Sequence, residues 1–127
     1  MPFRRPALAL CLLLLGCNSP KATMIFTPDN PFAAASALPY QAPAFDQIRT
    51  EHFQPAIEEG MRLQLAEVAQ IAADSAPPTF DNTIVAMERS GQLLMRAYSV
   101  FASLTQANTS DTLQQLQTEL APRLAAH

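Results

Sequence analysis

Three stretches of the chain space their apolar residues at steps of three and four, as one face of an α-helix does. The first stretch carries Phe53, Ile57, Met61, Leu65, Val68 and Ile71. The second carries Ile84, Met87, Gly91, Leu94, Tyr98, Phe101 and Thr105. The third carries Leu113, Leu116, Leu120 and Leu124. The pattern predicts an all-α fold with about three long antiparallel helices.

Proline and polar residues predict where the first helix begins and ends. It is expected to begin between Thr50 and Pro55. Proline has no backbone N–H to donate, and a helix tolerates this near its start, where the N–H groups have no partner within the helix. It is expected to end near Ala73, since the sequence Asp74-Ser75-Ala76-Pro77-Pro78 stops a helix.

Capping residues predict the start of the other two helices. Thr79 or Asp81 can cap the second helix. We expect one long helix to about Gln106, because its apolar phase persists through Gly91, and we expect any bend in it to lie at Gly91. A glycine on the apolar face suggests close approach of another helix. The cluster 108–111 is a second turn and cap, after which the third helix begins.

Residues 17–44 are expected to form a tether followed by an extended arm. Proline biases the preceding residue toward extended backbone, and this segment contains Pro20, Pro28, Pro31, Pro39 and Pro43. The arm also carries Phe32, Leu38 and Tyr40, which a pure spacer would not need. We therefore expect it to lie against another part of the protein.

The first residues have the features of a secretory signal peptide, predicted to span 1–16. Arg4 and Arg5 precede an apolar run over 7–15. This run is too short to cross a bilayer, which needs about 20 apolar residues.

The end of that run, Leu14-Leu15-Gly16-Cys17, resembles a bacterial lipobox, which predicts lipidation of Cys17. The alternative is an ordinary signal peptide with Cys17 incidental. Asn18 follows the cysteine, so we expect an outer-membrane lipoprotein that faces the periplasm, with the membrane as a partner through the lipid on Cys17.

Composition limits the partners and the fold. The charged share is 15% and the apolar share 49%, which is not the composition of a disordered chain. The pI is about 5.2 and the basic residues are scattered, so no nucleic-acid partner is expected.

No residue of the chain is predicted to be catalytic or to bind a metal. The two histidines, His52 and His127, lie at opposite ends of the helical region, and neither has a second histidine at metal-binding spacing. Glu58 and Glu59 point about 100° apart on a helix and are expected to belong to a solvated face. With Cys17 acylated, no thiol remains for chemistry.

Several motifs recur in the order and spacing of a known family. They are Asn30-Pro31-Phe32, Leu38-Pro39-Tyr40, Phe45-Asp46-Gln47-Ile48, His52-Phe53-Gln54-Pro55-Ala56-Ile57, the stretch 77–91, Ala107-Asn108-Thr109, and Ala121-Pro122 followed by Leu124-Ala125-Ala126-His127. Together they closely resemble the N-terminal region of bacterial peptidyl-dipeptidases, in the thimet oligopeptidase and oligopeptidase A group of zinc metallopeptidases. The resemblance covers about residues 30–127.

The resemblance implies a helical enzyme that encloses short peptides in a channel and releases C-terminal dipeptides. In that family, zinc held by an HExxH motif and a downstream glutamate activates a water molecule. Those residues lie in the C-terminal half of the family. None of these zinc-site residues corresponds to a position of this chain. The resemblance implies that the matching residues belong to the helical scaffold of the enzyme.

The sequence therefore predicts the N-terminal fragment of an exported zinc metallopeptidase, with residues 45–127 as a helical segment that is incomplete at its C-terminus. We expect the chain to be inactive alone and to bind no zinc itself. Apolar surface that three helices cannot bury should face a partner or the rest of the polypeptide. The alternative is a self-standing helical lipoprotein that serves as an interaction module.

Overall fold

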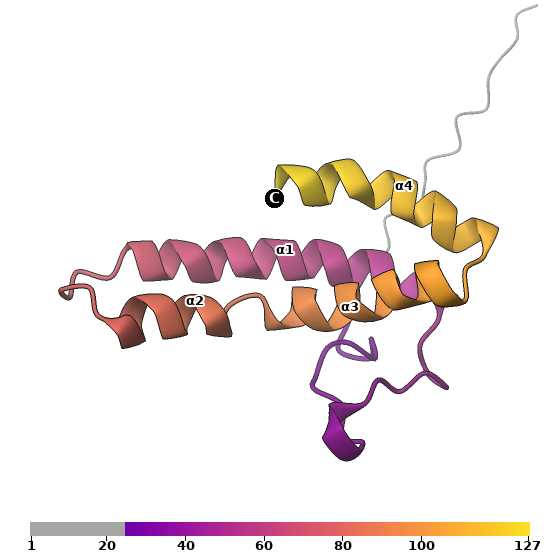
Figure 1. The fold of residues 1–127 in the computed structure, drawn as a ribbon, viewed down its shortest axis with the longest axis horizontal. Helices are drawn as coiled ribbons and strands as arrows, with labels where there is room; N and C mark the ends of the chain where they lie inside the picture. Colours follow the sequence, from indigo (N-terminus) through magenta and orange to yellow (C-terminus); the bar gives the residue numbers. More distant parts are fainter. Residues whose placement is uncertain (1–24) are drawn as a thin grey trace, which may run out of the picture.

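The computed structural model describes residues 25–127, and all of its regular structure is helical (Figure 1). The elements are η1 (Pro39–Gln41), α1 (Thr50–Ala72), the π-helical η2 (Phe80–Val85), α2 (Ala86–Arg89), α3 (Gln92–Ala107) and α4 (Asp111–Ala126). No strand occurs within residues 25–127, so the predicted all-α fold is confirmed. The predicted signal peptide over 1–16 and Cys17 lie outside the described residues.

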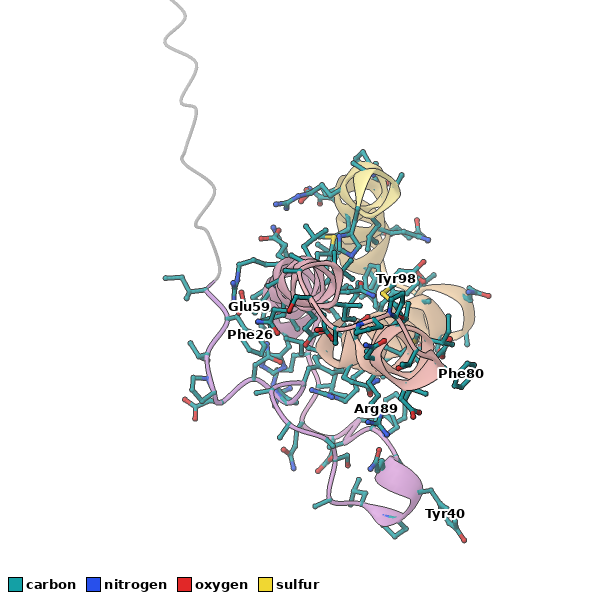
Figure 2. All side chains as sticks on the ribbon, turned by 90° about the vertical axis from the view of Figure 1, so that its left-hand side faces the viewer. Phe26, Tyr40, Glu59, Phe80, Arg89 and Tyr98 are labelled. Atoms are coloured by element: carbon teal, nitrogen blue, oxygen red, sulfur yellow. The ribbon has the colours of Figure 1, made fainter. Side chains whose placement is uncertain are left out.

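Helices α1 and α3 form the centre of the structure. They lie side by side and antiparallel, and α4 runs back above α1 (Figure 1). The arm, residues 25–49, lies on the other side of the α1–α3 pair from α4 (Figures 1 and 2). The central pair therefore has α4 on one side and the arm on the other.

A cluster of three phenylalanines joins the arm to the central helices. The ring of Phe53 on α1 is 5.3 Å from the ring of Phe32 in the arm, and 5.3 Å from that of Phe101 on α3, measured between centroids. Tilted aromatic contacts at this distance stabilise beyond their buried area. The other buried apolar residues are Ala56, Ile57, Leu93, Ala97, Val100, Leu113, Leu116 and Leu120. The core thus draws on all three long helices and the arm.

The first predicted helix is confirmed as α1, and its apolar face is only partly buried. It begins at Thr50, so Pro55 lies in its second turn. Phe53 and Ile57 are buried, whereas Leu65, further along the same face, is exposed. Burial along α1 therefore decreases away from the phenylalanine cluster.

The second predicted helix is broken, and the expectation of one unbroken helix is wrong. Gly91 adopts a left-handed conformation with φ of 70° between α2 and α3, and Ser90 before it is extended. A β-carbon on Gly91 would also lie 2.6 Å from the side chain of Gln64 on α1, so the suggested close approach is present. Glycine tolerates both the positive φ and the contact.

The predicted cap of the second helical region is confirmed, and Thr79 provides it. The hydroxyl of Thr79 accepts a hydrogen bond from the backbone N–H of Asn82 at 3.1 Å, and the side-chain oxygen of Asn82 accepts one from the N–H of Thr79 at 2.7 Å. These reciprocal bonds satisfy donors that a helix start leaves unpaired.

The break changes which face of the second region is buried. On α3 the buried residues are Leu93, Ala97, Val100 and Phe101. Ile84, Met87 and Tyr98, which the sequence pattern placed on a single face with Phe101, are exposed. The turn at Gly91 interrupts the helical phase, so residues before and after it do not share one face.

The third predicted helix is confirmed as α4. The Ser110 hydroxyl accepts a hydrogen bond from the backbone N–H of Leu113 at 3.3 Å, which caps the helix. Leu113, Leu116 and Leu120 are buried, and Leu124 packs against the same core.

The arm packs against the helices as expected, although only part of it does so. Phe32 is buried, and the buried Asn30 side chain accepts from the N–H of Phe32 and donates to the carbonyl of His52, both at 3.0 Å. Leu38 is exposed, and Tyr40 is fully exposed at the tip of the arm (Figure 2). Of the three large side chains that suggested packing of the arm, only Phe32 is buried among the described residues.

Glu67 on α1 stabilises the start of α3, and this contact is testable. Its carboxylate accepts a hydrogen bond from the N–H of Gly91 at 2.7 Å, at the positive end of the α3 dipole. We expect Glu67→Gln, which keeps the size of the side chain and removes its charge, to lower the free energy of unfolding by about 1 kcal/mol. Urea denaturation followed by circular dichroism measures the change.

Glu88→Gln is the matched control, because Glu88 is exposed on α2 and makes no hydrogen bond within residues 25–127. It should change stability by only a few tenths of a kcal/mol. Equal unfolding midpoints for Glu67→Gln and Glu88→Gln would contradict the capping role of Glu67.

Candidate functional site

His52 has a structural role at the start of α1. Its Nδ1 accepts a hydrogen bond from the backbone N–H of Arg49 at 3.1 Å. Its carbonyl accepts the bond from Asn30 that fixes the arm. An Nδ1 that accepts requires the neutral tautomer with the proton on Nε2. His52 therefore helps to cap the start of α1.

Glu58 and Glu59 point to different partners. Glu58 accepts from Gln54 of its own helix at 2.8 Å and forms an ion pair with Arg123 of α4. Glu59 pairs with Arg62 at 2.6 Å, on the side of α1 away from α3 (Figure 2). The hydrogen bond from Arg62 lowers the pKa of Glu59. This pair is largely exposed and therefore contributes little to stability.

Two polar contacts hold the second half of α4 against α1. One is the ion pair of Arg123 with Glu58, and the other joins His127 Nε2 to the side-chain oxygen of Gln64 at 2.8 Å. Glu58 is accordingly not part of a purely solvated face, which corrects the sequence interpretation. These contacts show that the second half of α4 lies close to α1.

Residues 25–127 contain no cluster of three or more His, Cys, Asp or Glu side chains that could hold a metal ion. His52 lies near the start of α1, and His127 contacts the middle of that helix. The described residues therefore do not supply the donor set that a catalytic zinc requires.

A cavity of about 610 Å³ lies between the arm and α3. Most of its lining is apolar and comes from small residues of the arm, and its charged groups are Arg96 and Asp46. Arg96 donates to the carbonyl of Phe32 at 3.2 Å, while its Nε finds no acceptor among the described residues. The contact with Phe32 makes Arg96 a second anchor of the arm.

Five large apolar residues of the second helical region are exposed, and we call them the outer apolar residues: Phe80, Ile84, Met87, Met95 and Tyr98. Between 43% and 71% of each of these residues is accessible to solvent. Phe80 points away from α1 (Figure 2). Gly91 separates the first three from the last two, and Met95 also lines the cavity between α3 and the arm.

Within residues 25–127, no helix combines the length and the apolar character that crossing a bilayer requires. The sequence pattern had assigned Ile84, Met87 and Tyr98 to the buried face, so it identified these apolar positions without identifying their exposure.

The described residues 25–127 therefore form an all-helical segment. No family model matches the chain. Two curated proteins do. The chain is 50% identical over 99 residues to a dipeptidyl carboxypeptidase of Escherichia coli strain K12, in an alignment that covers 78% of this chain and 14% of that protein. It is 46% identical over 97 residues to a dipeptidyl carboxypeptidase of Salmonella typhimurium strain LT2, covering 76% and 14% respectively.

Both of these relatives are peptidases, so the chain is related to that class of proteins. The chain is homologous to the N-terminal region of dipeptidyl carboxypeptidase. It spans about 14% of the length of the curated relatives that it matches. The predicted resemblance to the peptidyl-dipeptidases is thereby confirmed.

Proposed function

We propose that this chain forms the N-terminal helical segment of an exported zinc metallopeptidase that releases C-terminal dipeptides from short peptides. The observation that carries the proposal is the 50% identity to the E. coli dipeptidyl carboxypeptidase over 99 residues. The alignment covers 78% of the chain, and the regular structure of residues 25–127 is all helical.

In this proposal the segment supports the enzyme and does not carry out its chemistry. The zinc ion of such an enzyme polarises a bound water molecule for attack on the peptide bond. Since the described residues supply no donor set for zinc, its ligands would come from another part of the enzyme. This chain would contribute the packed pair of helices α1 and α3, which would support neighbouring parts of the enzyme.

The proposal also includes anchoring at a membrane. The lipobox-like sequence before Cys17 supports acylation of that cysteine, and Asn18 after it supports attachment to the outer membrane facing the periplasm. A multiply acylated cysteine provides the two or more chains that stable anchoring needs. The peptidase would then act on short peptides at the membrane surface.

The proposed function is tested by two activity measurements. The 127-residue chain, purified and supplied with zinc, should release no dipeptides from short peptides. A chimera in which the 99 aligned residues replace their counterparts in the E. coli enzyme should release dipeptides in a zinc-dependent manner. Removal of zinc from the chimera by a chelator should abolish this release.

Either of two results would overturn the proposal. One is robust zinc-dependent turnover by the isolated chain. The other is a chimera that is folded, as judged by circular dichroism, and yet inactive. The unmodified E. coli enzyme assayed in parallel is the control for the zinc and peptide conditions.

A further inference from the structure

Arg96 on α3 carries a positive charge with which no carboxylate of residues 25–127 pairs. The residue is half-buried and forms no ion pair in this part of the chain. A guanidinium group has five N–H donors. Among the described residues only Nη2 has an acceptor, the carbonyl of Phe32 at 3.2 Å, and the buried Nε has none. Because buried donors are normally paired, we expect an acceptor from outside the described residues.

The same residue lines the cavity between the arm and α3. The volume of this cavity, about 610 Å³, lies within the range of pockets that hold small organic ligands, roughly 300–1,000 Å³. Its apolar lining includes Pro31, Leu38, Ile48 and Val100. A mostly apolar wall with a few polar or charged groups is typical of ligand pockets, in which the polar groups orient the ligand.

We propose that this cavity binds a small organic carboxylate with an apolar body, and that the carboxylate pairs with Arg96. The planar fork of a guanidinium matches the two oxygens of a carboxylate. The apolar body would lie against the lining that the arm provides. Asp46 also lines the cavity and has no ion pair within residues 25–127, so it would repel the second negative charge of a phosphate. The inference does not depend on the proposed function.

Titration of the 127-residue chain with N-acetyl-leucine, followed by isothermal titration calorimetry, tests this inference. We expect saturable binding at one site. N-acetyl-leucinamide has the same apolar body without the charge, and inorganic phosphate has negative charge without the apolar body. Both should bind at least about tenfold more weakly, because charge-assisted hydrogen bonds are the stronger ones and the apolar body adds buried area.

A second probe, hexanoate, distinguishes two sources of the same ligand chemistry. Hexanoate carries a carboxylate on an apolar chain and has no peptide group. Tighter binding of N-acetyl-leucine than of hexanoate would identify the C-terminus of a peptide as the preferred ligand. Tighter binding of hexanoate would identify a simple aliphatic acid, and both results support a carboxylate site.

Two substitutions test the site residues separately. Arg96→Gln removes the charge and should weaken the binding of N-acetyl-leucine at least about tenfold, whereas Arg89→Gln, at an exposed position of α2 outside the cavity, should leave it unchanged. Ser99→Leu narrows the cavity, keeps Arg96, and should also weaken binding at least about tenfold. Its matched control is Ser103→Leu, at an exposed position of α3 outside the cavity.

Three results would overturn the inference. One is that neither N-acetyl-leucine nor hexanoate binds the unmodified chain at millimolar concentration. Another is that N-acetyl-leucinamide binds as tightly as N-acetyl-leucine. The third is unchanged affinity in a folded Arg96→Gln or Ser99→Leu variant, as judged by circular dichroism. If Arg96→Gln fails to fold because the arm loses its contact with Arg96, Ser99→Leu and the comparison with the amide still decide the question.

Discussion

Replacing Phe53 with alanine is expected to remove a large share of the free energy of unfolding of the chain. Phe53 is 1% exposed and contacts the rings of Phe32 and Phe101, so a single side chain joins α1, α3 and the arm. Truncating a buried phenylalanine to alanine costs about 3–5 kcal/mol, which includes the cavity left behind. A domain of this size has a total stability of about 5–15 kcal/mol, so the loss is a large share of it.

Urea denaturation followed by circular dichroism measures this effect, with Phe45→Ala as the matched control. Phe45 lies in the arm and is 57% exposed, so the same truncation there should cost less than about 1 kcal/mol. Similar unfolding midpoints for the two variants would show that the phenylalanine cluster does not form the centre of the core.

The sequence was sufficient to predict the helices and their caps, because the signals for both are local. The step of three and four residues that defines a helical face, and the cap of Thr79 with Asn82, each depend on residues within one or two turns. α4 was predicted well for the same reason, since its single leucine stripe is also its buried face.

The break at Gly91 has one local signal, the dipeptide Ser90-Gly91, which is typical of a turn, and the helical spacing outweighed it. Apolar residues continue at helical spacing on both sides of it, so periodicity alone favours one continuous helix. What favours the break is tertiary: Glu67 of α1 accepts the N–H of Gly91, and the Gln64 side chain occupies the place of a β-carbon. Contacts from a neighbouring helix thus override the periodic pattern.

The presence of exposed apolar residues was predicted from the sequence, but their positions were not. The sequence indicated that three helices would leave apolar residues unburied, and the outer apolar residues are exposed. Their positions were missed, because an apolar residue that packs within the segment and one that is exposed look alike in a sequence. Burial depends on which neighbours the segment has, and the homologous relatives are much longer than this chain.

One further position, Gly60, was missed although the sequence carried a signal for it. Gly60 follows Ala56 by four residues, on the same side of α1 as Phe53 and Ile57, and small residues at this spacing allow two helices to approach closely. A β-carbon on Gly60 would lie 2.7 Å from the backbone nitrogen and Cα of Leu94 on α3. The two backbones are therefore nearly in contact at this point.

Gly60→Ala is accordingly expected to destabilise the protein even though alanine favours helices. The gain in helix propensity is about 1 kcal/mol, whereas forcing an extra methyl group into a packed core typically costs 1–3 kcal/mol. Here the cost should reach the top of that range or exceed it, because the clash is with the Leu94 backbone, which cannot rotate away as a side chain can. Moving α3 away would also separate Phe101 from Phe53. We therefore expect a net loss of about 2 kcal/mol.

The urea unfolding midpoint measures this loss, and near-ultraviolet circular dichroism of the aromatic residues should show the altered phenylalanine contacts. Gln70→Ala provides the matched control, since Gln70 is exposed on the same helix and gains only propensity. It should leave stability unchanged or slightly higher. A Gly60→Ala variant as stable as Gln70→Ala would mean that α1 and α3 do not approach this closely in solution, and the rigid helix pair on which the proposed scaffold role depends would then lose its structural basis.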